Sequence, residues 1–163
     1  MIAIEADVSE EWDSRIDWAA LADRSVRAAV AHSRHAALNE NEAEVSIVFT
    51  GDEEVHALNA EWRGKDKATN VLSFPMVEED ELASAPMIGD IILANGVCTT
   101  EAADKNIAVE AHAAHLVVHG MLHLLGYDHE TSDADAEEME EVERRALASI
   151  GIADPYLMSE VQS

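Results

Sequence analysis

The chain has 163 residues, of which 10 are Lys or Arg and 34 are Asp or Glu, so its formal net charge is −24. This length predicts one domain over residues 1–163, and the 48% of hydrophobic residues is enough to fill a core. A single cysteine, Cys98, excludes an internal disulfide framework and a thiolate-cluster zinc site. The first residues lack the basic and apolar regions of a secretory signal, so we expect a soluble cytoplasmic protein.

Apolar periodicity and turn residues predict interleaved strands and helices around one core. In chain order we expect a strand (2–7), a helix (15–38), a strand (44–50), a helix (53–62), a polar loop (63–69), a strand (70–74), an acidic loop (76–86), a strand (88–94) and helices from 101 to 151 with a break at 126–132. Asp52 and Asp133 are predicted to cap the second and the last helix. The predicted class is α+β, with an α/β fold around a small mixed sheet left open.

The charges are unevenly distributed along the chain. Residues 130–143 hold eight acids and no base, whereas Arg63, Lys65 and Lys67 are three of the ten basic residues within five positions. A strongly negative chain disfavours nonspecific nucleic-acid binding. Exposed charges more than roughly 8 Å apart are largely screened, so a local basic site remains compatible with the acidity. A solvated helix face and a charged loop are the alternative interpretations.

Five of the eight histidines lie within 18 residues: His112, His115, His119, His123 and His129. The first four fall within about 40° of one helical line. His119 and His123 are four residues apart, so their imidazoles can converge on one ion, and a turn at Gly126 can bring His129 to the same place. We therefore predict a metal site made by His119, His123 and His129. The remaining histidines have no partner at metal-ligand spacing: His32, His35 and His56.

Three neutral imidazoles are typical of catalytic rather than structural zinc sites, because a fourth position stays open to water. Zinc at such a site lowers the pKa of bound water to about 7. The same spacing occurs in metzincin-type zinc proteases, which have a Glu directly after the first histidine as general base. Here that residue is Gly120, which cannot transfer a proton to a leaving amine. A phosphodiester depends more on cations that stabilise phosphoryl oxygens, and the cluster at Arg63 supplies them.

The segment HLVVHGMLHLLGYDH (115–129) resembles the signature of the YbeY family, bacterial endoribonucleases of ribosomal RNA maturation. The resemblance extends to LNAEWRGKDKATNVLSFP (58–75), IGDIILA (88–94), the acidic helix and GIADPY (151–156).

This resemblance implies a zincin-like α+β fold with a small mixed sheet against helices, and one zinc ion held by His119, His123 and His129. It also implies a catalytic role for Arg63 and cleavage of single-stranded RNA in 16S rRNA 3′-end maturation and ribosome quality control. The implied partners are rRNA, the small ribosomal subunit and assembly proteins bound to it, with no membrane and no DNA.

Two other functions stay open from the residues: a metal-dependent peptidase, and an assembly factor in which zinc only joins the helix end to the following loop. His115 either orients a ligand or reaches substrate, or it packs. Asp128 either hydrogen-bonds a ligand imidazole or caps the turn. Thr69, Asn70 and Ser73 are candidates for lining the cleft, and Cys98 is expected in the core.

Overall fold

A computed structural model describes residues 1–128 and 132–155 and contains a four-stranded sheet in the order β1-β2-β4-β3. The strands are β1 (Ala3–Val8), β2 (Glu44–Thr50), β3 (Val71–Pro75) and β4 (Met87–Ala94). β1, β2 and β4 are parallel, and β3 pairs antiparallel with β4 at the edge. This small mixed sheet packed against helices confirms the predicted α+β class.

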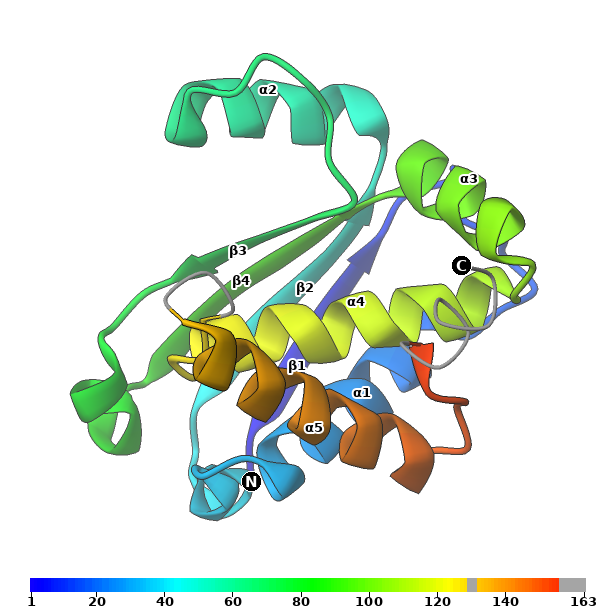
Figure 1. Cartoon of the computed structure of the whole chain (residues 1–163). Helices are drawn as coiled ribbons and strands as arrows, with labels where there is room; N and C mark the ends of the chain where they lie inside the picture. Colours follow the sequence, from blue (N-terminus) through cyan, green and yellow to red (C-terminus); the bar gives the residue numbers. More distant parts are fainter. Residues whose placement is uncertain (129–131, 156–163) are drawn as a thin grey trace.

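Helices cover both faces of the sheet (Figure 1). They are α1 (Trp18–His32), α2 (Asp52–Arg63), α3 (Asn95–Lys105), α4 (Val109–Leu124) and α5 (Asp133–Ser149), with short 3₁₀ helices η1 (Ala36–Glu40) and η2 (Glu79–Ser84). α1 and α4 pack on one face with α5 outside them, and α2 packs on β3 and β4 from the other face. None of the helices described has both the length and the apolar composition needed to cross a membrane.

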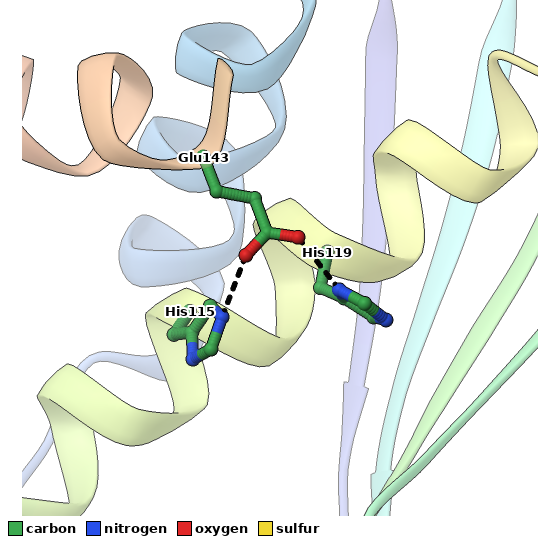
Figure 2. Close-up of side chains that lie close together, drawn as sticks. All are labelled: His115, His119 and Glu143. Atoms are coloured by element: carbon green, nitrogen blue, oxygen red, sulfur yellow. Dashed lines mark hydrogen bonds and ion pairs between the residues drawn. The ribbon is translucent and has the colours of Figure 1, made fainter. Parts of the chain in front are cut away.

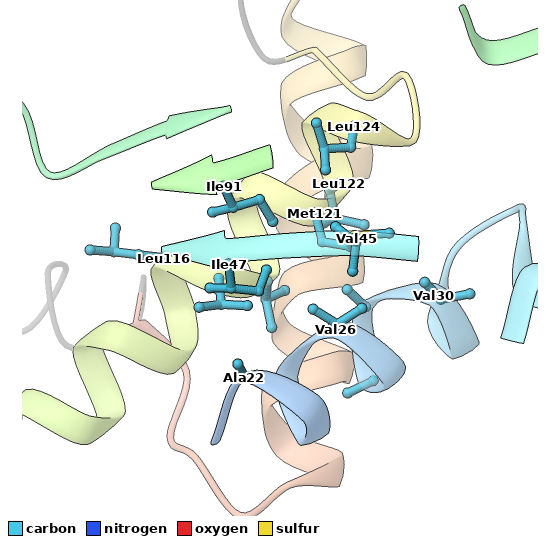
Figure 3. Packing of buried hydrophobic residues seen from close by; sticks show 14 of the residues in the cluster. Ala22, Val26, Val30, Val45, Ile47, Ile91, Leu116, Met121, Leu122 and Leu124 are labelled. Atoms are coloured by element: carbon cyan, nitrogen blue, oxygen red, sulfur yellow. The ribbon is translucent and has the colours of Figure 1, made fainter. Parts of the chain in front are cut away.

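The core forms because successive strand residues point to opposite faces of the sheet. In β4, Ile91 joins the large cluster with α1 and α4, whereas Ile92 joins the smaller cluster with Val55 of α2. Figure 3 shows the larger cluster, in which Val26 of α1 and Met121 of α4 meet the sheet. The two helical layers are thereby fixed to the sheet, and α4 is fixed beside edge strand β3.

Two helix boundaries differ from the sequence prediction. The helix predicted over 15–38 is shorter, because the side chain of Asp17 caps its start by accepting from the Ala20 N–H and the backbone becomes extended at Ser33. The helical region predicted from 101 begins earlier, at Asn95, and is divided at Asn106, whose φ of 56° is left-handed. The acidic loop 76–86 contains η2.

Both predicted caps are wrong by one residue. Gly51 is the N-cap of α2, and the Asp52 carboxylate instead accepts from the Val97 N–H at 3.1 Å, which ties α2 to α3. Ser132 rather than Asp133 caps α5, since its hydroxyl accepts from the Asp135 N–H at 3.1 Å. A serine cap and an acidic first turn both favour the helix N-terminus.

α4 is buried on nearly all sides. Between residues 111 and 124, the partly exposed positions recur every four residues and are Ala111, His115, His119 and His123, while the other ten are buried. Because residues four apart lie on one face of a helix, a single accessible stripe remains, and histidines supply most of it.

Gly120 faces the sheet. A Cβ added there would lie 3.0 Å from Ile91 Cγ2 and 3.0 Å from Ser73 Oγ, so these two side chains would have to shift. The position that holds the general base in metzincin proteases is therefore tightly packed in this fold, which disfavours a glutamate there.

We expect Gly120→Glu to destabilise the fold by about 3 kcal/mol or more, because it forces a charged side chain into the α4–sheet contact. Ala103→Glu, at an exposed position of α3, is the control and should change the free energy of unfolding by less than about 0.5 kcal/mol. Urea unfolding followed by circular dichroism measures both. Equal midpoints for the two variants would contradict the packing described.

Candidate metal centre

A cleft of about 650 Å³ lies between α4 and edge strand β3. The α4 side is lined by the histidines of the stripe, and the opposite side by Thr69 and Asn70 before β3 and by Val71, Ser73 and Pro75 of β3. The three β3 residues alternate because the strand repeat of two turns their side chains toward α4. Arg63, at the end of α2, also lines the cleft, so the structure brings the basic cluster and the histidine stripe to one place.

The C-terminus of α4 returns the chain toward its own last turn. Gly126 has a φ of 96°, as the sequence predicts for a left-handed turn, and its N–H bonds the His123 carbonyl at 3.1 Å. The Tyr127 N–H bonds the Leu122 carbonyl at 3.0 Å, which completes a Schellman motif. This turn places the Tyr127 carbonyl oxygen 3.1 Å from His123 Nδ1, where it accepts a hydrogen bond from the ring.

The same turn is held from outside by Arg34. Its guanidinium lies 4.1 Å from the centre of the Tyr127 ring and forms ion pairs with Glu79 of η2 at 2.6 Å and Glu138 of α5 at 2.7 Å. The hydrogen bond to Glu79 raises the pKa of Arg34, so this cation keeps its charge. Arg34 therefore joins three segments around the end of α4.

His119 and His123 face each other through their Nε2 atoms, which are 3.1 Å apart. His119 donates its Nδ1–H to Glu143 Oε1 at 2.7 Å, as His123 donates to Tyr127, so each Nε2 carries a lone pair. Two lone pairs at this distance repel unless a proton or a metal ion lies between them. In tetrahedral zinc sites with Zn–N of 2.0–2.1 Å, ligand nitrogens are about 3.3 Å apart, so this pair fits a zinc ion.

Glu143 of α5 joins two of the histidines (Figure 2). One carboxylate oxygen accepts from His119 Nδ1, and the other accepts from His115 Nε2 at 2.8 Å. The side chain is 1% exposed. Burial raises the pKa of the Glu143 carboxyl, but the hydrogen bonds from His115 and His119 outweigh it and lower the pKa to about 2. The carboxylate is thus ionised and orients the His119 ring.

His115, His119 and Glu143 are also the described side chains that could themselves hold a metal ion, because their ligand atoms lie within 4.8 Å of one another. The hydrogen bonds at 2.7 and 2.8 Å, together with the Nε2 atoms of His119 and His123 facing each other, favour Glu143 as an orienting group. The His119–His123 pair is then the better candidate for binding metal.

The structure places most of the other candidate site residues at the cleft. Arg63 is exposed, as expected, and Asp128 is exposed at the cleft. His129, the predicted third ligand, lies outside the described residues. His115 does not merely pack, since it bonds Glu143. Thr69, Asn70 and Ser73 line the cleft.

The described histidines outside the metal pair have protein partners. His112 is buried, which lowers its pKa, and bonds Glu101 at 2.8 Å. Three histidines without a partner at metal-ligand spacing in the sequence bond backbone or carboxylate groups: His32, His35 and His56. Cys98 is buried as predicted, and burial raises the pKa of its thiol to about 12, so it is no nucleophile.

The chain is similar to known proteins over nearly its whole length. The family model described as Endoribonuclease YbeY matches residues 8–151. Proteins named Endoribonuclease YbeY from Novosphingobium aromaticivorans and Erythrobacter litoralis are 53% and 52% identical, covering 96% and 95% of this chain and 97% and 95% of their own. The solution structure of a Thermotoga maritima protein superposes with a TM-score of 0.59 and 26% identity, covering 90% of this chain and 87% of that one.

Replacing Glu143 tests its orienting role. In Glu143→Gln the side-chain amide keeps one acceptor, so His115 and His119 cannot both donate to it, and we expect zinc affinity to fall about 10- to 100-fold. The matched control is Glu141→Gln on the same helix, where an exposed carboxylate bonds Arg145. Chelator competition measures the affinity, and circular dichroism checks the fold. Parental affinity in Glu143→Gln would show that the carboxylate does not orient the site.

Proposed function

The chain belongs to the Endoribonuclease YbeY family, and from this premise we propose that it cleaves single-stranded RNA in a cleft whose zinc ion is held by His119, His123 and His129. Membership makes the chain an endoribonuclease, a hydrolase of phosphodiester bonds. The family's role in rRNA maturation and ribosome quality control supports 16S rRNA 3′-end maturation as its task. We propose the small ribosomal subunit and the assembly proteins bound to it as partners, within a single domain over residues 1–163.

One observation carries most of this proposal: the facing Nε2 atoms of His119 and His123 lie in a cleft that Arg63 also lines. A zinc ion bound by these histidines supplies a Lewis acid that polarises a phosphoryl oxygen or a water. An open cleft gives a phosphodiester access to that position. A purely structural zinc would not need such access.

Other residues of the chain orient the two histidines and bind the phosphate. Glu143 and the Tyr127 carbonyl hold the Nδ1 hydrogens of His119 and His123, which keeps both Nε2 lone pairs directed to one point. Arg63 presents a planar guanidinium that can bond two phosphoryl oxygens and offset the charge that develops on them. The exposed Asp128 borders the same cleft.

The peptidase alternative lacks a group for its chemistry. A leaving amine needs a proton, and Gly120 occupies the position from which metzincin proteases deliver it. Gly120 packs tightly against Ile91 and Ser73, so a larger side chain there would have to displace them. Phosphodiester cleavage depends on charge stabilisation instead, which suits the residues of this cleft.

We expect Arg63→Ala to lower the rate of RNA cleavage about 100-fold or more, by analogy with the loss of an oxyanion donor. Arg63→Lys should be nearly as damaging, because an ammonium group cannot bond two oxygens in one plane. Zinc content and melting temperature should stay close to the parent, since Arg63 is exposed. Cleavage of a labelled, unstructured RNA oligomer measures the rate.

Arg145→Ala is the control, because Arg145 is an exposed arginine of α5 that bonds Glu141 at 3.1 Å. It should cleave at the parental rate. Parental cleavage by Arg63→Ala would show that Arg63 is only a surface charge. Absence of cleavage by the zinc-loaded parent, on any single-stranded RNA, would refute the proposed function itself.

A further inference from the structure

Trp62 is exposed at the last turn of α2, directly before Arg63. Its side chain is 67% exposed, whereas Trp12 and Trp18 are 2% and 3% exposed and pack edge-on against each other in the core. In the described parts of the chain, the exposed large apolar side chains are Met1, Val8, Trp62 and Met76. A singly exposed apolar residue is common on protein surfaces, so the exposure of Trp62 matters here only together with the cations beside it.

Trp62 is exposed because of its place at the end of α2. At 100° per residue, Trp62 lies within about 60° of Val55 and Asn59, the two buried residues of α2. It is therefore on the helix face that packs on the sheet one and two turns earlier, but at this turn nothing described covers it. The next residue, Arg63, lines the cleft, so the backbone of Trp62 is one residue away from a cleft residue.

The cations beside Trp62 form an exposed cluster without ion pairs among the described residues, where Arg24 is a single exposed arginine that also lacks one. Within residues 1–128 and 132–155, arginines that form ion pairs with Asp or Glu are Arg15, Arg27, Arg34, Arg144 and Arg145. Over the same ranges no ion pair links Arg63, Lys65 or Lys67 to a carboxylate, and all three are exposed. In a chain with a net charge of −24, these are cations available to an anion.

Backbone hydrogen bonds hold this basic segment in place. Gly64 has a φ of 67° and ends α2, and the Lys65 N–H then bonds the Asn59 carbonyl at 3.2 Å. The buried Asn59 side chain donates to the Lys67 carbonyl at 2.9 Å. Both lysines are thereby fixed against the last turn of α2, where Trp62 is.

We propose that Trp62, Lys65 and Lys67 form a docking surface for the single-stranded RNA that extends out of the cleft. The proposal rests on the proposed function and names where that substrate is held. An unpaired base stacks on the indole face, and the neighbouring phosphates pair with the two ammonium groups. A single aromatic ring among cations suits single-stranded nucleic acid, in which every base has a face to stack. A duplex keeps its bases stacked on each other and gains only the phosphate contacts.

Steady-state cleavage of an unstructured 12-nucleotide uridine-rich RNA tests the surface. Stacking of one base is worth about 1–3 kcal/mol, so Trp62→Ala should raise KM about 5- to 150-fold while kcat stays within about twofold. Trp62→Phe should recover most of the loss, because a phenyl ring still stacks. Val8→Ala, at an exposed apolar residue of the opposite edge strand, is the matched control with parental KM.

The lysines have a separate measurement. The double variant Lys65→Gln, Lys67→Gln should raise KM. It should also lower the slope of log KM against log salt concentration by about 1.4, since each phosphate contact to a single strand contributes about 0.7 to that slope. Arg145→Gln should leave that slope unchanged. Tryptophan fluorescence gives a direct signal: the same RNA should quench the parent, and the quenching should be lost in Trp62→Phe, because the other two tryptophans are buried.

The outcomes separate this inference from the function on which it rests. The docking surface would be overturned, and the nuclease left in place, by one combination of results. In that combination the parent cleaves RNA, Trp62→Ala has the parental KM, and RNA quenches the fluorescence of Trp62→Phe as it does that of the parent. A parent that neither cleaves nor is quenched by RNA would overturn both.

Discussion

A buried carboxylate costs several kcal/mol of folding free energy unless charged or hydrogen-bonded groups compensate it. In this fold the compensation for Glu143 comes from two imidazoles of α4, at 2.7 and 2.8 Å. α5 can therefore dock only where its carboxylate reaches His115 and His119, and the His119 ring can adopt only the orientation that donates Nδ1–H to it. The contact of Glu143 with the two histidines thus fixes both the position of α5 and the direction of the His119 Nε2 lone pair.

The orientation of His123 depends on a turn rather than on a helix. The Schellman motif at Gly126 brings the Tyr127 carbonyl to His123, as Glu143 is brought to His119. Arg34 joins that turn to η2 and α5 through Glu79 and Glu138. Both imidazoles are oriented from outside before any ligand binds, which lowers the entropic cost of assembling a metal site.

The distribution of charge explains how so acidic a chain can act on RNA. Acidic residues pair with most of the described arginines, whereas the segment from Arg63 to Lys67 gathers three exposed cations for which no ion pair is found among residues 1–128 and 132–155. Surface charges beyond about one Debye length are screened, so the net charge weakens long-range attraction of RNA more than it affects local contacts. Recognition is then concentrated at the cleft and the end of α2.

Local signals were enough to predict much of this molecule. The apolar run at 44–50 matches β2, and Gly126 has the predicted left-handed conformation. The break at Asn106 was missed because no Gly or Pro marks it, although Asn tolerates a positive φ. Glu143 was missed among eight acids. Its spacing was a usable signal, since it lies four residues from both Met139 and Leu147, which are buried.

The central claim is that Glu143 orients a histidine pair which binds the metal, and does not bind the metal itself. Anomalous diffraction at the zinc edge from crystals of the zinc-loaded protein locates the ion directly. The account predicts a peak about 2.0–2.1 Å from Nε2 of both His119 and His123, with the Glu143 carboxylate still bonded to His119 Nδ1. A peak coordinated by the Glu143 carboxylate together with His115 would contradict it.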